Sequence, residues 1–106
     1  MKEKIKHVLK DFKANISVLY GDRIKQIILF GSHARGDADE ASDIDIMIVL
    51  KGNISPAEEI KRSSELIADL SLKFDTVISC LFASENKFQL KKTPLYLNIK
   101  KEGIVL

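Results

Sequence analysis

The chain contains few cysteine, tryptophan and proline residues. Its 106 residues include one cysteine, no tryptophan and two prolines. A single cysteine excludes a disulfide within the chain, and Cys80 lies in an apolar run, which is typical of a buried structural thiol. No apolar stretch approaches the roughly 18 residues that span a bilayer, and the N-terminal segment lacks the apolar core of a signal peptide. The sequence therefore predicts a cytoplasmic protein without a membrane segment.

A strong charge of one sign is also missing. Seventeen basic and fifteen acidic residues give a formal net charge of +2. General nucleic-acid binders carry a larger basic excess, so we expect no dedicated nucleic-acid surface. A hydrophobic content of 45% over 106 residues suits one compact domain, residues 1–106, without room for a second.

A turn that can hold phosphate follows an apolar run ending at Phe30. Gly31-Ser32 then leads into His33-Ala34-Arg35, which indicates a strand feeding a short helix. Backbone N–H groups at such a helix start favour an anion, and the Ser32 hydroxyl can add a hydrogen bond. Arg35 could bring a guanidinium to the same anion, or it could pair with Asp37 or Asp39. The turn predicts a triphosphate site.

Two carboxylates, Asp43 and Asp45, begin the next apolar run. In an extended strand, side chains two residues apart point to the same face and lie roughly 6.5 to 7 Å apart. Carboxylates so placed can converge on a pair of Mg²⁺ ions, and their mutual repulsion favours a bound cation. The alternation puts them on one face of the strand and four apolar residues on the other, namely Ile44, Ile46, Ile48 and Leu50.

Helices are predicted where apolar residues recur at helical spacing and where start signals precede them. The first helix should bury Ile5, Val8, Leu9, Phe12, Ile16 and Leu19. Ser55-Pro56, followed by Glu58, is typical of an N-cap with a capping box, and that helix should bury Ile60, Leu66, Ile67 and Leu70. Ser84 and Thr93-Pro94 predict two shorter helices, and Gly103 should end the second.

The predicted order is αβαβαβααβ, which indicates an α/β (α+β) fold with a small mixed sheet and helices packed mainly on one face. The expected elements are helices at about 2–19, 33–35, 55–72, 84–90 and 93–101, and strands at about 24–30, 44–50, 74–81 and 104–106.

Asp75 falls at the start of the third predicted strand. A carboxylate there is costly to bury unless it is paired or binds a cation. Asp69 is the competing acid, but it lies within a predicted helix.

Gly31-Ser32, ten residues and Asp43-Ile44-Asp45, within Gly31-Ser32-His33-Ala34-Arg35-Gly36 and Ser42-Asp43-Ile44-Asp45, resemble the signature of the DNA polymerase beta-like nucleotidyltransferases. More narrowly, the chain resembles the minimal nucleotidyltransferases, and the closing Glu102-Gly103-Ile104-Val105-Leu106 extends that resemblance over nearly the whole length. The resemblance implies that Gly31, Ser32 and Arg35 bind the phosphates of a nucleoside triphosphate. It also implies that Asp43, Asp45 and Asp75 are catalytic and hold two Mg²⁺ ions.

The resemblance further implies a biological role. Minimal nucleotidyltransferases are often antitoxins paired with a HEPN-domain ribonuclease toxin, and some transfer AMP from ATP to a tyrosine of that toxin. We therefore expect a type VII-like toxin–antitoxin antitoxin that transfers AMP to a hydroxyl of a partner protein in a hetero-oligomer.

Two alternatives remain open. The chain could neutralise a toxin by binding alone, without catalysis. It could instead be the catalytic subunit of a two-chain transferase for a small-molecule hydroxyl. The sequence fixes neither the acceptor nor the base of the nucleotide.

Overall fold

The computed structural model describes all 106 residues, and its elements follow the predicted αβαβαβααβ order, with one added 3₁₀ turn. The elements are α1 (Glu3–Tyr20), η1 (Gly21–Arg23), β1 (Ile24–Phe30), α2 (Ser32–Arg35), β2 (Ile44–Leu50), α3 (Pro56–Phe74), β3 (Ile78–Ser84), α4 (Glu85–Leu90), α5 (Pro94–Glu102) and β4 (Ile104–Val105). None of the helices is long and apolar enough to cross a membrane.

The four strands form one mixed sheet in the order β3-β2-β1-β4. β1 runs antiparallel to β2 and β4, whereas β2 and β3 are parallel because α3 crosses over between them. β2 is an inner strand with helices on both faces, so six of its seven residues are buried and its sequence is nearly all apolar.

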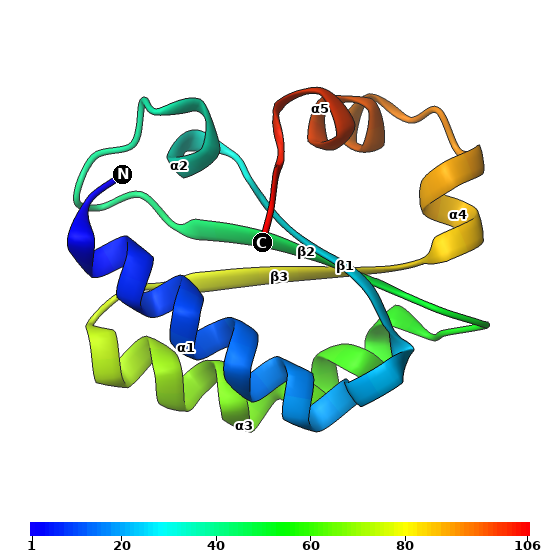
Figure 1. Ribbon diagram of the computed structural model, residues 1–106, viewed down its shortest axis with the longest axis horizontal. Coiled ribbons are helices and arrows are strands. Elements are labelled where there is room, and N and C mark those ends of the chain that lie inside the picture. The colour runs from blue at the N-terminus through cyan, green and yellow to red at the C-terminus, as the bar shows by residue number, and fades with distance from the viewer.

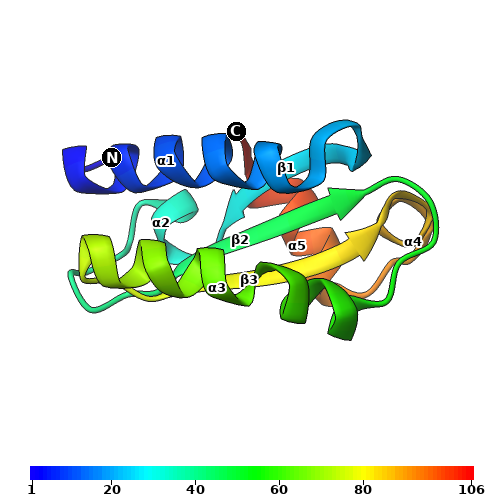
Figure 2. The same cartoon turned by 90° about the horizontal axis from the view of Figure 1, so that it is seen from below.

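Helices cover both faces of the sheet (Figure 1). The two long helices, α1 and α3, lie side by side on one face, as Figure 2 also shows, and α4 and α5 lie on the other. The larger core contains Phe12, Ile46 and Leu70 from α1, β2 and α3. A smaller core on the opposite face contains Met47, Phe88 and Ile99. The expected alternation along β2 is confirmed, because Ile44, Ile46, Ile48 and Leu50 all belong to the larger core.

The contact between α1 and α3 corrects two predicted core positions. Leu19 is 39% exposed and Ile60 is 53% exposed, whereas Tyr20 and Glu59 are buried beside them. The Tyr20 hydroxyl donates to Glu59 Oε1 at 2.9 Å, and Arg62 Nε donates to the same oxygen at 3.0 Å. A carboxylate with these partners can be buried, and spacing of apolar residues alone gives no sign of it.

The helix start predicted at Ser55-Pro56 is confirmed in position, but the predicted capping hydrogen bond is absent. Ser55 occupies the N-cap position of α3, but its side chain makes no capping hydrogen bond. Ser84 and Thr93 do cap α4 and α5, since they accept hydrogen bonds from the backbone N–H groups of Lys87 and Tyr96.

The start of the third strand is also corrected. α3 continues to Phe74, and Asp75 then ends it in a left-handed conformation with φ of 49°. The strand therefore begins at Ile78, and Asp75 is an exposed helix cap. The β-branched residues that follow Asp75 favoured a strand. The helix, however, extends two residues beyond its predicted end, so the first residues of the predicted strand belong to the helix and its cap.

Candidate active site

The phosphate turn and the carboxylate pair are brought into contact by the β1–β2 pairing. Phe30, the last residue of β1, lies opposite Asp45 in β2. Gly31 follows with φ of 72°, and a Cβ atom added to it would overlap the Asp45 carboxylate. Only glycine fits such a backbone conformation and such a close approach without strain. Gly31 therefore lets the turn lie directly against Asp45.

The single turn of α2 follows from this glycine. The backbone N–H groups of Ala34 and Arg35 both donate to the Gly31 carbonyl at 3.1 Å. The first N–H groups of a helix have no acceptor inside it, so those of Ser32 and His33 are the ones available to an anion at this end. Ser32 is half-buried.

Asp43 and Asp45 stand at the start of β2. Asp43 is exposed and immediately precedes the strand, and Asp45 is half-buried within it. Burial raises the pKa of the Asp45 carboxyl, and the charge of Asp43 raises it further, whereas His33 and Arg35 oppose the rise. The two carboxylates are thus close enough to repel each other. A cation between them would relieve that repulsion.

Arg35 is held by carboxylates. Its Nε donates to Asp37 Oδ2 at 3.2 Å, and one terminal nitrogen lies 3.6 Å from Glu102 Oε2. These two acids raise the pKa of the Arg35 guanidinium. The pairing with Asp37 is the alternative that the sequence left open. To reach a phosphate, Arg35 would have to exchange at least one of these partners.

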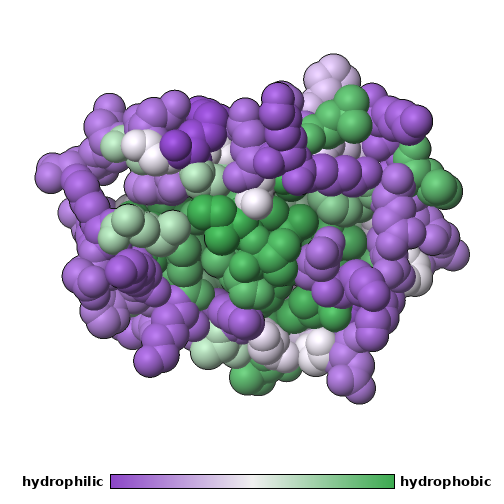
Figure 3. Space-filling model, turned by 45° about the horizontal axis from the view of Figure 1, so that its top comes forward, coloured by the Kyte–Doolittle hydropathy of each residue, from purple (hydrophilic) through white to green (hydrophobic).

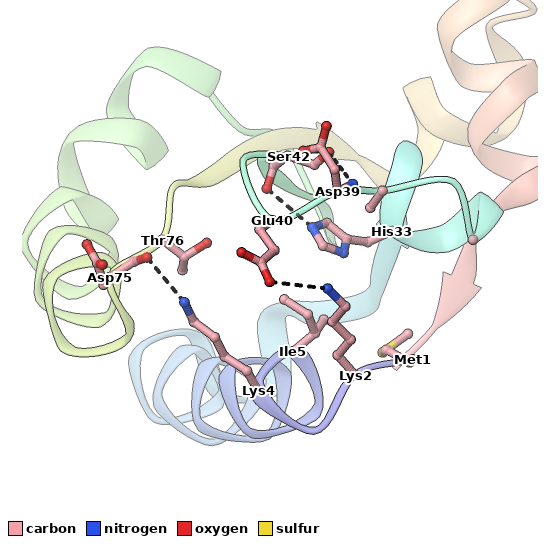
Figure 4. A pocket seen from close by; sticks show the side chains of 12 residues that line it. Met1, Lys2, Lys4, Ile5, His33, Asp39, Glu40, Ser42, Asp75 and Thr76 are labelled. Atoms are coloured by element: carbon pink, nitrogen blue, oxygen red, sulfur yellow. Dashed lines mark hydrogen bonds and ion pairs between the residues drawn. The ribbon is translucent and has the colours of Figure 1, made fainter.

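Asp75 is not brought to the carboxylate pair. It lines a cavity of about 850 Å³ between the start of α1, the loop before β2 and the turn before β3. Figure 4 shows Asp75 and Thr76 at one end of this cavity and His33 at the other, with Lys4 donating to the Asp75 carbonyl at 3.3 Å. No three side chains of the His, Cys, Asp and Glu types gather as a metal-binding group. The role of Asp75 as a third ligand stays a prediction.

The residue of β3 that lies beside Asp45 is Ser79. The parallel register pairs Asp45 with Ser79, and paired residues of adjacent strands point to the same face. Ser79 is half-buried. A strand prediction displaced by three or four residues could not have identified this neighbour, because register depends on tertiary pairing.

Residues 3–106 match the family described as polymerase beta, nucleotidyltransferase. The chain belongs to this family. Among its relatives, a Methanocaldococcus jannaschii protein named as a protein adenylyltransferase is 40% identical over 99 residues, covering 92% of this chain and 93% of that protein. The protein adenylyltransferase MntA of Thermococcus cleftensis is 33% identical over 76 residues, covering 72% of this chain and 75% of its own.

Solved structures support the same fold. A nucleotidyltransferase from Sulfolobus solfataricus superimposes with a TM-score of 0.64 at 21% identity, covering 99% of this chain and 86% of the other. A toxin–antitoxin structure with AMP-PNP superimposes with a TM-score of 0.60 at 22% identity, covering 96% of this chain and 68% of the other. The protein is thus a nucleotidyltransferase with a four-stranded mixed sheet.

The donor set of this nucleotidyltransferase fits one divalent cation. Asp43 and Asp45 supply hard oxygen ligands, and burial, with the charge of Asp43 adding to it, raises the pKa of the Asp45 carboxyl. Mg²⁺ ordinarily completes its coordination with substrate phosphates and water, so two carboxylates suffice for one ion. A second ion would need a ligand that this arrangement does not bring to the pair.

Two positioning residues were missed by sequence reasoning. His33 Nε2 lies 3.3 Å from the Ser42 carbonyl oxygen, so it links the helix after the phosphate turn to the residue before Asp43. Glu102 reaches Arg35 from the far end of the chain. The only available signal was that both residues lie within segments that carry the family resemblance, since neither contact follows from local spacing.

Proposed function

We propose that the protein transfers AMP from ATP, with Mg²⁺, to a hydroxyl of a partner protein, specifically a tyrosine of a HEPN-domain toxin, and so acts as an antitoxin. The observation that carries the transfer chemistry is the contact between Gly31 and the Asp45 carboxylate, which joins the phosphate turn to the metal-binding pair. The choice of AMP and of a protein acceptor rests on relatives named as protein adenylyltransferases, MntA among them. Toxin–antitoxin structures that share the fold support a partner toxin.

Each residue of the motif has a distinct task in this reaction. Ser32, through its hydroxyl and its backbone N–H group, and the backbone at Gly31 bind the β- and γ-phosphates. Asp43 and Asp45 would hold Mg²⁺, which polarises a phosphoryl oxygen and offsets charge on the leaving group. The acceptor oxygen forms a bond to the α-phosphorus, the bond from that phosphorus to the bridging oxygen breaks, and pyrophosphate leaves while the hydroxyl proton is released.

Substitution of the carboxylates tests the reaction. Asp43→Asn and Asp45→Asn keep the side-chain shape but remove the charge, so we expect transfer of label from α-labelled ATP to fall by about a hundredfold or more. Asp22→Asn is the matched control, because Asp22 is an exposed acid in η1. Transfer at the wild-type rate by Asp43→Asn or Asp45→Asn would contradict the proposal.

Asp75→Asn tests the third carboxylate separately. Asparagine tolerates the left-handed backbone that Asp75 adopts, so the variant should fold. A loss of transfer as large as that of Asp45→Asn would show that Asp75 reaches the site when substrate binds. Transfer close to that of the wild type would show that Asp43 and Asp45 are sufficient.

Growth assays with the toxin separate catalysis from binding. If AMP transfer neutralises the toxin, Asp45→Asn should fail to rescue growth while still associating with the toxin, and the toxin should lack an added AMP by mass. Rescue by Asp45→Asn would instead support neutralisation by contact alone.

A further inference from the structure

Ser79 is the one polar residue of β3 that shares a face of the sheet with Asp45. The parallel register places Ser79 opposite Asp45. Two residues further along, Leu81 lies opposite Met47, and both belong to the smaller core or pack against it. Alternate residues of a strand share a face, so Asp45 and Ser79 also face the side that α4 and α5 cover. β3 therefore presents a neutral hydroxyl, and no carboxylate, beside Asp45.

The row that contains Asp45 and Ser79 is less buried than the next row of the same face. Phe30 of β1 lies opposite Asp45 on its other side, and all three residues are half-buried. In the next row, Ile28 and Met47 are buried in the smaller core. Figure 3 looks more directly onto this side of the molecule and shows apolar side chains in the middle of a hydrophilic surround. The row thus combines an aromatic ring, a carboxylate and a hydroxyl.

The other carboxylates near this row already have partners or tasks. Asp37 and Glu102 both pair with Arg35, at 3.2 and 3.6 Å. Asp43 and Asp45 would hold Mg²⁺, and a carboxylate that binds a metal ion does so in its deprotonated form, in competition with protons. None of these four carboxylates is therefore free to take a proton from the acceptor.

His33 and Asp75 both line the cavity beside the start of α1. Figure 4 shows them at opposite ends of this cavity. His33 Nε2 lies 3.3 Å from the carbonyl oxygen of Ser42, which can only accept a hydrogen bond, so this nitrogen carries its proton and cannot act as a base. Asp75 ends α3, one of the two helices on the opposite face of the sheet. The position beside Asp45 on β3 is therefore left to Ser79.

The acidity of the acceptor decides how much a missing base matters. A tyrosine hydroxyl has an ordinary pKa of about 10. The hydroxyls of serine and threonine are far weaker acids and depend more on assistance. A positioned base ordinarily accelerates such a reaction by about a hundredfold to ten-thousandfold. The ring of Phe30 would in addition pack against the ring of a phenol. A site of this composition suits a phenolic acceptor.

We propose that Ser79 is a specificity-determining residue, whose neutral hydroxyl leaves Asp45 without a third carboxylate and so restricts AMP transfer to phenolic hydroxyls. This inference rests on the proposed function and names the residue that restricts its acceptor. The phenolic oxygen forms a bond to the α-phosphorus, the bond to the bridging oxygen breaks, pyrophosphate leaves, and the proton passes to water. A carboxylate at position 79 would hold a second cation together with Asp45, which would favour ionisation of an aliphatic hydroxyl.

Two acceptors with the same ring test the restriction. N-acetyltyrosinamide carries a phenol, and N-acetyl-4-(hydroxymethyl)phenylalaninamide carries an alcohol at the same place. We expect the wild type to transfer label from α-labelled ATP to the phenol about a hundredfold or more faster than to the alcohol. Ser79→Asp should narrow this ratio by about tenfold or more, and Ser79→Asn, which has the shape of aspartate without its charge, should leave it within about twofold.

A count of bound ions gives a readout besides activity. The probes are Mn²⁺ and α,β-methylene-ATP, in which a methylene group replaces the bridging oxygen so that no transfer occurs. In equilibrium dialysis, we expect Ser79→Asp to bind about one Mn²⁺ more per chain than the wild type, because it adds a third hard ligand. Ser79→Asn should bind as many ions as the wild type.

Three results would overturn the role of Ser79. These are equal transfer to the two acceptors by the wild type, equal ion counts in the wild type and Ser79→Asp, and equal narrowing of the acceptor ratio by Ser79→Asn, which would attribute the effect to size. The wild-type comparison remains decisive even where Ser79→Asp fails to fold. An absence of transfer to both acceptors by the wild type would instead contradict the proposed function, and the ion count would still decide the role of Ser79.

Discussion

At the scale of single residues, Gly31 carries the strongest constraint in the active site. Its backbone has a positive φ of 72°, and any side chain would meet the Asp45 carboxylate. Gly52 has a similar φ of 76° but nothing within 4 Å of a Cβ atom added there. A comparison of substitutions at Gly31 and Gly52 therefore separates the effect of backbone strain from the effect of a clash with Asp45.

We expect Gly31→Ala to lose transfer activity almost completely, because the methyl group would displace Asp45. Gly52→Ala should keep its activity and lose about 1 to 2 kcal/mol of unfolding free energy from the positive φ alone. Urea denaturation and AMP transfer of both variants are the measurements. Equal activity in the two variants would show that the contact of Gly31 with Asp45 has no catalytic role.

Glu59 is the residue whose ionisation most directly affects stability. Glu59 is 2% exposed, and although burial acts to raise the pKa of its carboxyl, hydrogen bonds from Tyr20 and Arg62 hold that pKa below its usual value. A lowered pKa in the folded state means that the charged form stabilises the fold above the unfolded pKa of about 4.5. That stabilisation is lost as the pH falls through the folded-state pKa.

We therefore expect Glu59→Gln to lower the unfolding free energy by about 2 to 3 kcal/mol near neutral pH. The difference from the wild type should shrink as the pH falls below the unfolded pKa. Glu58→Gln, a change at the exposed neighbouring residue, is the control and should stay within about 0.5 kcal/mol. A difference that is independent of pH would show that packing, and not charge, explains the effect. Thermal unfolding across the pH range is the measurement.

At the scale of elements, the short helices depend on their caps. The Ser84 hydroxyl accepts from the Lys87 backbone N–H at 3.2 Å, at the point where β3 turns into α4. Ser55 stands at the same position of α3 without such a bond. Ser84→Ala should therefore cost about 1 kcal/mol in urea unfolding, and Ser55→Ala should cost almost nothing. Equal losses would show that the hydrogen bond at Ser84 is not the cause.

Most elements could be predicted from the sequence because their signals are local. Strands β1 and β2 begin and end as predicted, and α4 and α5 start at their predicted caps. The third strand could not be placed, because Asp75 ends α3 in a left-handed conformation that apolar patterning does not report. For the same reason the sequence could not show that Ser79 lies next to Asp45, since register is a property of two paired strands.

At the scale of the whole molecule, binding of the nucleotide should stabilise the fold. A ligand that binds only the folded state at a hundred times its dissociation constant adds about 2.7 kcal/mol. We expect ATP with Mg²⁺ to raise the melting temperature and ATP with a chelator to raise it less, because Asp43 and Asp45 repel the triphosphate unless a cation lies between them. In Asp45→Asn the contribution of Mg²⁺ should largely disappear. An equal shift with and without the chelator would contradict a metal site at this pair.

The sequence by itself determined the family, the order of elements and the two halves of the motif, because each depends on residues close together in the chain. The tertiary structure decided which other residues these motif residues contact. It placed Gly31 against Asp45 and paired Arg35 with Asp37 and Glu102. It also made Asp75 the C-cap of α3, outside the carboxylate pair. These outcomes depend on strand register, on where α3 ends and on how the C-terminal helix folds back, and each is fixed by packing between segments distant in sequence.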